Sequence, residues 1–116
     1  MDTRRKIVAG EAAPAGCTVV TGYFDVLSSA DVRELSDLRR PVIAIVLPLA
    51  AELLNQRARA ELAAGMRVID YVLLAGAAGA EPLFDLLRPA QIVRLEAAQA
   101  RRSRELKEHV RNRQTC

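Results

Sequence analysis

The sequence predicts an α/β fold, a Rossmann-like three-layer sandwich in which helices cover both faces of a mainly parallel sheet of about four strands. Two observations support this prediction. Strand-like and helix-like segments alternate along the 116 residues. The strand-like segments are also continuous apolar runs, as expected for strands that are buried on both faces. We therefore expect one domain over residues 1–116, a length that suits a single hydrophobic core.

Four strands and four helices are expected in alternation. The expected strands are CTVVTGYF (17–24), PVIAIVLP (41–48), VIDYVLLAG (68–76) and the weaker AQIVRLE (90–96). The expected helices cover 29–40, 55–67, 81–89 and, as a charged and basic C-terminal helix, 97–113. Because its apolar run is uninterrupted, strand 17–24 is expected at the centre of the sheet, parallel to 41–48.

Local signals mark the ends of these helices. Asn55 is a typical N-cap, and Gly65 lies near the end of the same helix. Pro82 falls in the first turn of the next helix, and Pro89 lies beyond its end. These residues predict where helices 55–67 and 81–89 begin and end.

Composition excludes several classes of protein. Hydrophobic residues make up 51% of the chain, which argues against disorder. Aromatic residues make up only 3%, too few for a surface that stacks single-stranded nucleic acid. His109 is the only histidine, and Cys17 and Cys116 are the only cysteines, so we expect no metal site and two free thiols.

The charge is concentrated in one segment. Residues 97–113 carry six basic and two acidic side chains in a chain whose net charge is +3, so the remainder is close to neutral. A basic helix can bind nucleic acid or an acidic partner, but this much charge more often marks a solvated face. The pattern therefore does not favour a nucleic-acid partner.

Targeting signals and membrane spans are not expected. No apolar core follows the charged MDTRRKIVAG, and the longest apolar stretch, 41–54, contains Pro48 and Glu52. We therefore expect a cytoplasmic protein without a membrane partner. A domain this short has little chain with which to cover both faces of a sheet, so we also expect a homodimer formed through an edge strand or the last helix.

The turn after the first strand is the expected binding site. Open parallel sheets bind ligands beyond the carboxyl ends of their strands. Gly22 lets a ligand approach the backbone, and the first amides of the following helix favour an anion. The candidates for binding a nucleotide or sugar phosphate are Gly22, Tyr23, Phe24, Asp25, Ser28, Ser29 and Arg57.

Each candidate also has a structural alternative. Ser28 and Asp31 form a capping-box-like pattern, which can simply start a helix. Asp25 can make a turn, and Arg57 can be a solvated residue in the first turn of a helix. Asp70 is more readily explained as a brace for the neighbouring strand than as a ligand.

The longer stretch TGYFDVLSSADVREL (21–35) resembles the first motif of nucleotidyltransferases of the cytidylyltransferase-like type, which act on glycerol, ethanolamine or heptose phosphates. The family pattern is roughly T-[NG]-G/x-F-D-x-L-H-x-G-H-V-x-x-L. Residues in register with it are Phe24, Asp25, Leu27, Val32 and Leu35. Further matches are Gln56, Arg57, Arg67 and Asp70 in the segment 54–74, and KIV (6–8) and LRPAQIVRLE (87–96) resemble the heptose-phosphate branch.

The chain departs from this family at the residues that carry the chemistry. The two histidines of H-x-G-H stabilise the attacked phosphate in the family; here they fall on Ser28 and Asp31, with Ala30 at the glycine. Serine carries no positive charge, and an aspartate opposes the charge that must develop. Two like charges about 4 Å apart repel by ~4 kcal/mol at an effective dielectric near 20. The late motif that closes the triphosphate site is also missing.

The resemblance therefore implies a degenerate nucleotidyltransferase-like domain, impaired in catalysis, which binds a ligand or interacts with a homologous pathway enzyme. Ser28 and Asp31 mark the degenerate catalytic positions. One alternative is an active cytidylyl- or adenylyltransferase with a rebuilt site, which would use Mg²⁺ with its nucleoside triphosphate. A weaker alternative is an accessory protein that binds nucleic acid through the basic helix.

Overall fold

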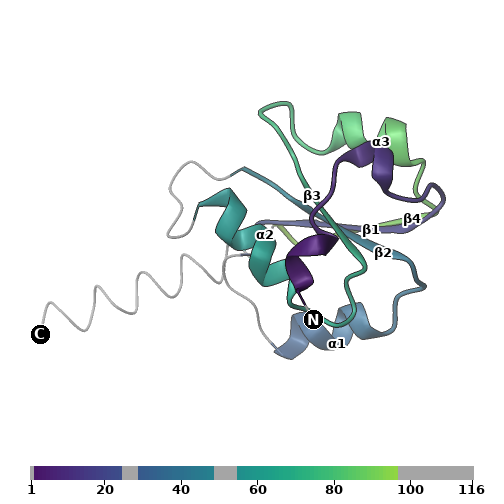
Figure 1. The fold of residues 1–116 in the computed structure, drawn as a ribbon. Helices are drawn as coiled ribbons and strands as arrows, with labels where there is room; N and C mark the ends of the chain where they lie inside the picture. Colours follow the sequence, from purple (N-terminus) through teal and green to yellow (C-terminus); the bar gives the residue numbers. More distant parts are fainter. Residues whose placement is uncertain (1, 25–28, 49–54, 97–116) are drawn as a thin grey trace, which may run out of the picture.

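The sheet has four parallel strands, as the sequence predicts. The structure is a computed structural model that describes residues 2–24, 29–48 and 55–96. Its strands are β1 (Thr18–Gly22), β2 (Val42–Val46), β3 (Tyr71–Leu74) and β4 (Gln91–Arg94), in the order β3-β2-β1-β4 (Figure 1). Every pairing is parallel, and β1 lies between β2 and β4. The predicted central position of the first strand is confirmed.

The helices alternate with the strands as expected. They are α1 (Ser29–Ser36), α2 (Gln56–Ala64) and α3 (Glu81–Leu87). Asn55 caps α2 by accepting a hydrogen bond from the Ala58 amide at 2.8 Å, and Gly65 is its C-cap. Pro82 lies in the first turn of α3. The cap signals in the sequence are therefore confirmed, although each helix is shorter than its predicted range.

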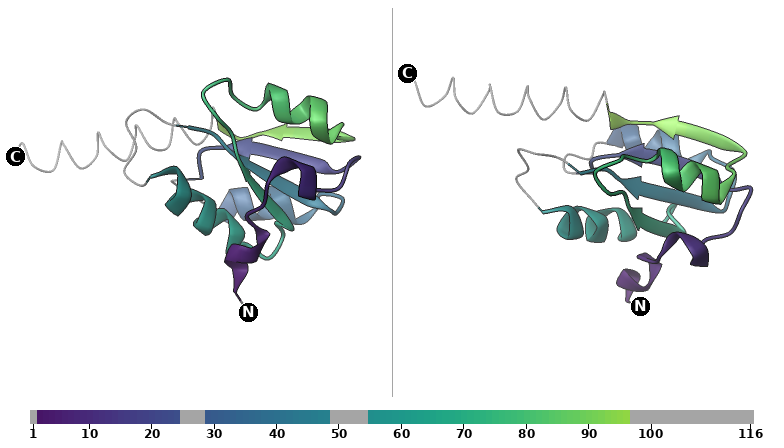
Figure 2. Two further views of the ribbon diagram at one scale, coloured as in Figure 1. Left: turned by 45° about the horizontal axis from the view of Figure 1, so that its top comes forward. Right: turned by 90° about the horizontal axis from the view of Figure 1, so that it is seen from above.

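The strand order explains which face each helix covers. The path β1-α1-β2-α2-β3 moves in one direction across the sheet, and right-handed crossovers then place α1 and α2 on the same face. The step from β3 to β4 moves back past β1 and places α3 on the opposite face. Figure 2 shows this three-layer arrangement, with α3 across the sheet from α1 and α2.

Two apolar cores fill the space between the layers. One core packs Val20, Phe24, Val42 and Val72 of the sheet region against Leu35 of α1 and the alanines of α2. The other packs Cys17, Val19, Ile43, Ile45 and Leu73 against Leu87 of α3. Alternate residues of β1 and β2 point to opposite cores, which is why both strands read as continuous apolar runs. Burial also raises the pKa of the Cys17 thiol, which is free.

The N-terminal segment adds a feature that the sequence did not suggest. It contains two short 3-10 helices, η1 (Thr3–Lys6) and η2 (Gly10–Ala12). Between them Ile7 forms a parallel bridge with Val72, and the Val8 amide donates to the Val72 carbonyl at 3.0 Å. Ile7 packs into one core and Val8 into the other, as in a strand. This segment thus extends the sheet beside β3 and helps α3 to cover the second face (Figure 1).

Some predictions fall on residues outside the described ranges. These are the basic helix 97–113 with His109, the thiol of Cys116, and the turn residues Asp25 and Ser28. Among the helices of the described ranges, none is both long enough and apolar enough to cross a membrane.

Candidate functional site

The order in which strands are added to the sheet reverses at β1. β2 and β3 follow on one side of β1, whereas β4 lies on the other side. In an open parallel sheet, the crevice beyond the carboxyl ends of the strands at such a reversal is the favoured place for a ligand. The candidate site is therefore centred on the end of β1, between β2 and β4, where the sequence also places it.

The residues at the end of β1 differ in burial, and therefore in which of their atoms a ligand could contact. Gly22 ends the strand and is buried, and its carbonyl accepts a hydrogen bond from the Leu47 amide at 2.9 Å. Tyr23 is half-buried. Phe24 is fully buried in the core that contains α1 and α2, so a ligand could contact only its backbone. With a φ of 58°, Phe24 adopts the left-handed conformation that bulky residues rarely occupy, a type of strain found more often at ligand sites.

Helix α1 follows this turn and begins at Ser29. Asp31 is its third residue, which puts Asp31 in the first turn, where amides without helical partners give a partial positive charge. An anion is stabilised at such a position. The predicted start of this helix is confirmed, and Asp31 belongs to its first turn.

Arg59 joins the ends of β1 and β2. Its side chain is fully buried, and Nη1 donates to the carbonyl oxygens of Tyr23 at 3.0 Å and Leu47 at 2.7 Å. The backbone that leaves the two central strands is thus held by one guanidinium. Arg59 gives the carboxyl edge of the sheet a buried positive charge close to the expected anion site.

Gln56 performs a similar function one turn earlier on α2. Its Nε2 donates to the carbonyl of Val46 at 2.9 Å and to that of Ala75 at 2.7 Å, which fixes the ends of β2 and β3. Gln56 matches the family segment, but Arg59 was not among the sequence candidates. Residues 56, 59, 60 and 63 share one helix face, and this spacing could have pointed to Arg59 as the inward arginine.

Arg57, the arginine selected from the sequence, lies on the outer side of α2. Its side chain is 58% exposed and forms an i,i+4 ion pair with Glu61 at 3.7 Å. Arg67 is also exposed. The structure brings Arg59, and not Arg57, to the end of β1. Arg57 is therefore a solvated residue in the first turn of a helix, which was the alternative to a binding role in the sequence analysis.

A carboxylate lies at the reversal point itself. The Thr21 hydroxyl of β1 donates to Glu96 Oε2 at 2.7 Å, immediately after the end of β4. Arg94 lies 3.8 Å from the other Glu96 oxygen and stacks over the Phe84 ring. Glu96 was not predicted as a site residue. Its position suits an acceptor of ligand hydroxyl groups and opposes a highly charged anion.

Asp70 has the bracing role that the sequence favoured. Its Oδ2 accepts from the Val42 amide at 2.8 Å, and its carboxylate also pairs with Arg40. Burial alone would raise the pKa of Asp70, but the hydrogen bonds from Arg40 and Val42 hold it below the ordinary value. This contact lies where β2 and β3 begin, at the opposite end of the sheet from the candidate site.

The carboxyl edge gathers several polar groups around the end of β1. Within residues 2–24, 29–48 and 55–96, no group of three or more His, Cys, Asp or Glu side chains gathers to hold a metal ion. The described polar groups are the first turn of α1, the buried Arg59 and the Thr21–Glu96 pair. Together they place a helix start, a buried positive charge and a carboxylate at the same edge of the sheet.

Comparisons with known proteins support the fold. No protein-family model matches the chain, and no curated protein matches its sequence. The chain is similar to the crystal structure of the lipopolysaccharide core biosynthesis protein from Thermoplasma volcanium GSS1. The TM-score is 0.58 and the identity 16%, over 65% of this chain and 70% of that one. At this identity the likeness shows a shared α/β fold.

Proposed function

We propose that this chain is a degenerate nucleotidyltransferase-like domain that binds a phosphorylated ligand at the carboxyl edge of its sheet without efficient nucleotidyl transfer. The observation that carries the proposal is the position of Asp31 in the first turn of α1, directly after the central strand. An anion site built on that helix start keeps its amides but contains a carboxylate where the family has a histidine.

Three further points support this function. Arg59 supplies a buried positive charge that fixes the same edge. Glu96 supplies an acceptor for a hydroxyl group at the reversal point. The shared fold with a biosynthesis protein is compatible with a sugar-phosphate ligand. The combination favours a ligand with one phosphate and several hydroxyl groups over a nucleoside triphosphate. The larger negative charge of a triphosphate would be repelled by the carboxylates of Asp31 and Glu96.

Calorimetric titration with CTP and with ATP, each with magnesium, tests this proposal. The wild-type protein is expected to bind both weakly or not at all. Asp31→Asn removes the repulsion and leaves the amides, so it should tighten nucleotide binding by about tenfold. Asp85→Asn, on the exposed side of α3, is the matched control and should change nothing.

A pyrophosphate-release assay with sugar phosphates decides between binding and catalysis. The proposal expects no release by the wild-type protein, because the histidine positions hold no group that can carry positive charge. Robust release that depends on a sugar phosphate would overturn the proposal and establish the alternative, an active cytidylyl- or adenylyltransferase with a rebuilt site.

A further inference from the structure

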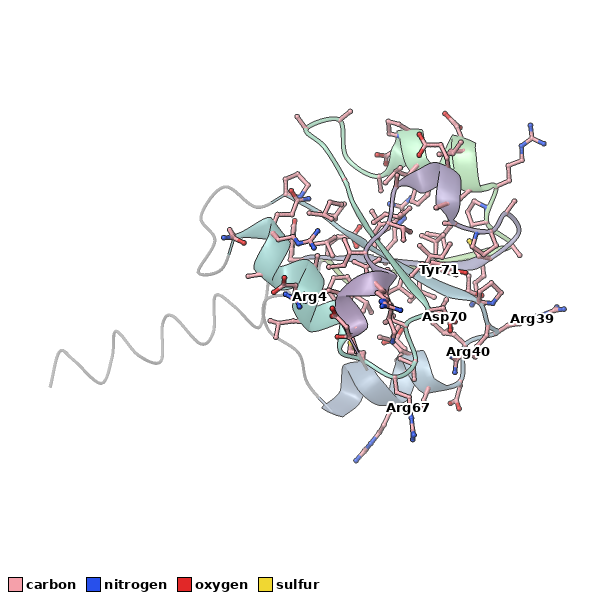
Figure 3. All side chains as sticks on the ribbon, in the orientation of Figure 1. Arg4, Arg39, Arg40, Arg67, Asp70 and Tyr71 are labelled. Atoms are coloured by element: carbon pink, nitrogen blue, oxygen red, sulfur yellow. The ribbon has the colours of Figure 1, made fainter. Side chains whose placement is uncertain are left out.

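A pocket lies at the amino edge of the sheet, where the strands begin, opposite the candidate site. Its volume is about 630 Å³, within the range typical of small-molecule sites. Three segments that are far apart in the sequence form it: η1, the residues before β2, and the start of β3. Figure 3 shows Arg40, Asp70 and Tyr71 together at this end of the sheet, with Arg39 and Arg67 nearby.

Three cations and two carboxylates, Asp2 and Asp70, line this pocket. Arg5, Lys6 and Arg40 line it, and a neighbouring pocket of about 300 Å³ adds Arg39 while sharing Arg40. Arg5 and Arg39 are exposed, and no carboxylate of the described residues lies within ion-pair distance of either. Lys6 is held in place because its Nζ donates to the Met66 carbonyl at 3.1 Å. The cations are therefore gathered without an equal number of anions.

Arg40 is fixed in position. Its Nε and Nη2 donate to the two oxygens of Asp70 at 3.2 Å and 2.5 Å, a two-pronged contact that orients the guanidinium. The Asp70 carboxylate is anchored in turn by the Val42 amide. The Arg40 side chain nevertheless remains 60% exposed, so its other donors are accessible to a ligand.

The rest of the lining suits a ligand with hydroxyl groups. Thr3 offers a hydroxyl, and Asp2 and Asp70 offer carboxylate oxygens that can accept from a polyol. Tyr71 is half-buried and gives the pocket an aromatic wall. A phosphate ester carries a charge of about −1.5 to −2. It therefore matches a cluster of three cations better than a ligand with one carboxylate group would.

We propose that the amino-edge pocket is a second binding site, which takes a small phosphate ester of a hydroxylated compound. Arg5, Lys6 and Arg40 bind the phosphate, and Thr3 and the carboxylates bind hydroxyl groups. Arg5, Lys6 and Arg40 line one pocket of about 630 Å³, a size that favours a small ligand over a nucleic acid. This site is independent of the one at the carboxyl edge.

Titration of the full chain with glucose 6-phosphate, followed by amide chemical shifts in NMR spectra, tests the proposal. Saturable shifts are expected at Arg5, Val42 and Tyr71, and inorganic phosphate should compete, whereas glucose should cause no shifts. Arg5→Gln should weaken binding about tenfold because it removes one charged donor. Arg33→Gln is the matched control, since Arg33 is exposed on α1 and lines neither pocket.

Arg40→Gln is a second variant in a different segment and should also weaken binding about tenfold, with a circular dichroism spectrum confirming that each variant is folded. Shifts confined to Gly22 and the first turn of α1 would overturn this proposal while supporting the carboxyl-edge site. Equal affinities for Arg5→Gln and Arg33→Gln would also overturn it. Tighter binding of a single-stranded oligonucleotide through Arg5 and Arg40 would replace it with a nucleic-acid surface.

Discussion

Arg59 donates a hydrogen bond from Nη1 to the Leu47 carbonyl at 2.7 Å, and its side chain is fully buried. The same nitrogen reaches the Tyr23 carbonyl, so one charged group from α2 ties together the chain that leaves β1 and the chain that leaves β2. The geometry of the candidate site therefore depends on a residue beneath it. The stability of the fold should depend on the same residue.

Arg59→Met should lower the free energy of unfolding by about 2–4 kcal/mol, because the carbonyls of Tyr23 and Leu47 lose a charged donor. Arg57→Met, two residues earlier on the outer side of α2, should cost less than about 0.5 kcal/mol, since an exposed i,i+4 ion pair contributes little. Urea denaturation of both variants measures the difference. Similar losses in the two variants would contradict the structural role assigned to Arg59.

Asp70 should make the stability depend on pH. Its pKa is lower in the folded chain than in the unfolded chain, so its contribution is complete above the unfolded pKa of about 3.9 and is lost as the pH falls through the folded value. Asp70→Asn should therefore cost about 1–2 kcal/mol at pH 7. The difference from wild type should stay constant down to about pH 5 and shrink below about pH 4.

Urea denaturation at a series of pH values between 7 and 3 measures this difference. Asp85→Asn, on the exposed side of α3, is the control and should follow the wild-type curve. If the difference in the free energy of unfolding between wild type and Asp70→Asn grows as the pH falls, the Arg40 contact does not favour the charged carboxylate.

We also expect a homodimer in solution. β4 is at the edge of the sheet, and none of the described residues pairs with its outer side. Ile92 on this strand is 39% exposed, which leaves apolar surface beside unpaired backbone groups. Light scattering at ~100 μM should give twice the monomer mass, since even micromolar contacts are occupied at that concentration. A monomer under these conditions would rule the dimer out.

Much of the fold could be predicted from the sequence because its signals are local. The apolar run at 17–24 has no polar alternation, which places β1 inside the sheet, and Asn55 and Pro82 mark helix starts through their own chemistry. β3 was predicted from residue 68 but begins at Tyr71. The chain between α2 and β3 makes a turn in which the Ile69 amide donates to the Met66 carbonyl. Ile69 is therefore buried, and Val68 partly buried, without belonging to the strand.

The candidate site could be predicted only in part. The position of Asp31 follows from the helix start, which is local, whereas the roles of Arg59 and Glu96 depend on contacts with residues 12 to 75 positions away. Arg57 was selected because it aligns with a family position, but the face of a helix that packs inward is decided by the apolar residues around it. In α2 these are Ala60 and Ala63, which turn Arg59 inward and Arg57 outward.

The N-terminal segment imposes an order on how the chain can fold during synthesis. Residues 7 and 8 leave the ribosome before β1, but their partner Val72 and the helix α3 that lies beside η2 are made much later. β1, α1 and β2 can associate as soon as they emerge, while the segment before them must wait without its partner. Neither core can therefore close before β3 is made, and a chain arrested before β3 would leave the apolar residues of β1 and β2 open to chaperones and to other nascent chains.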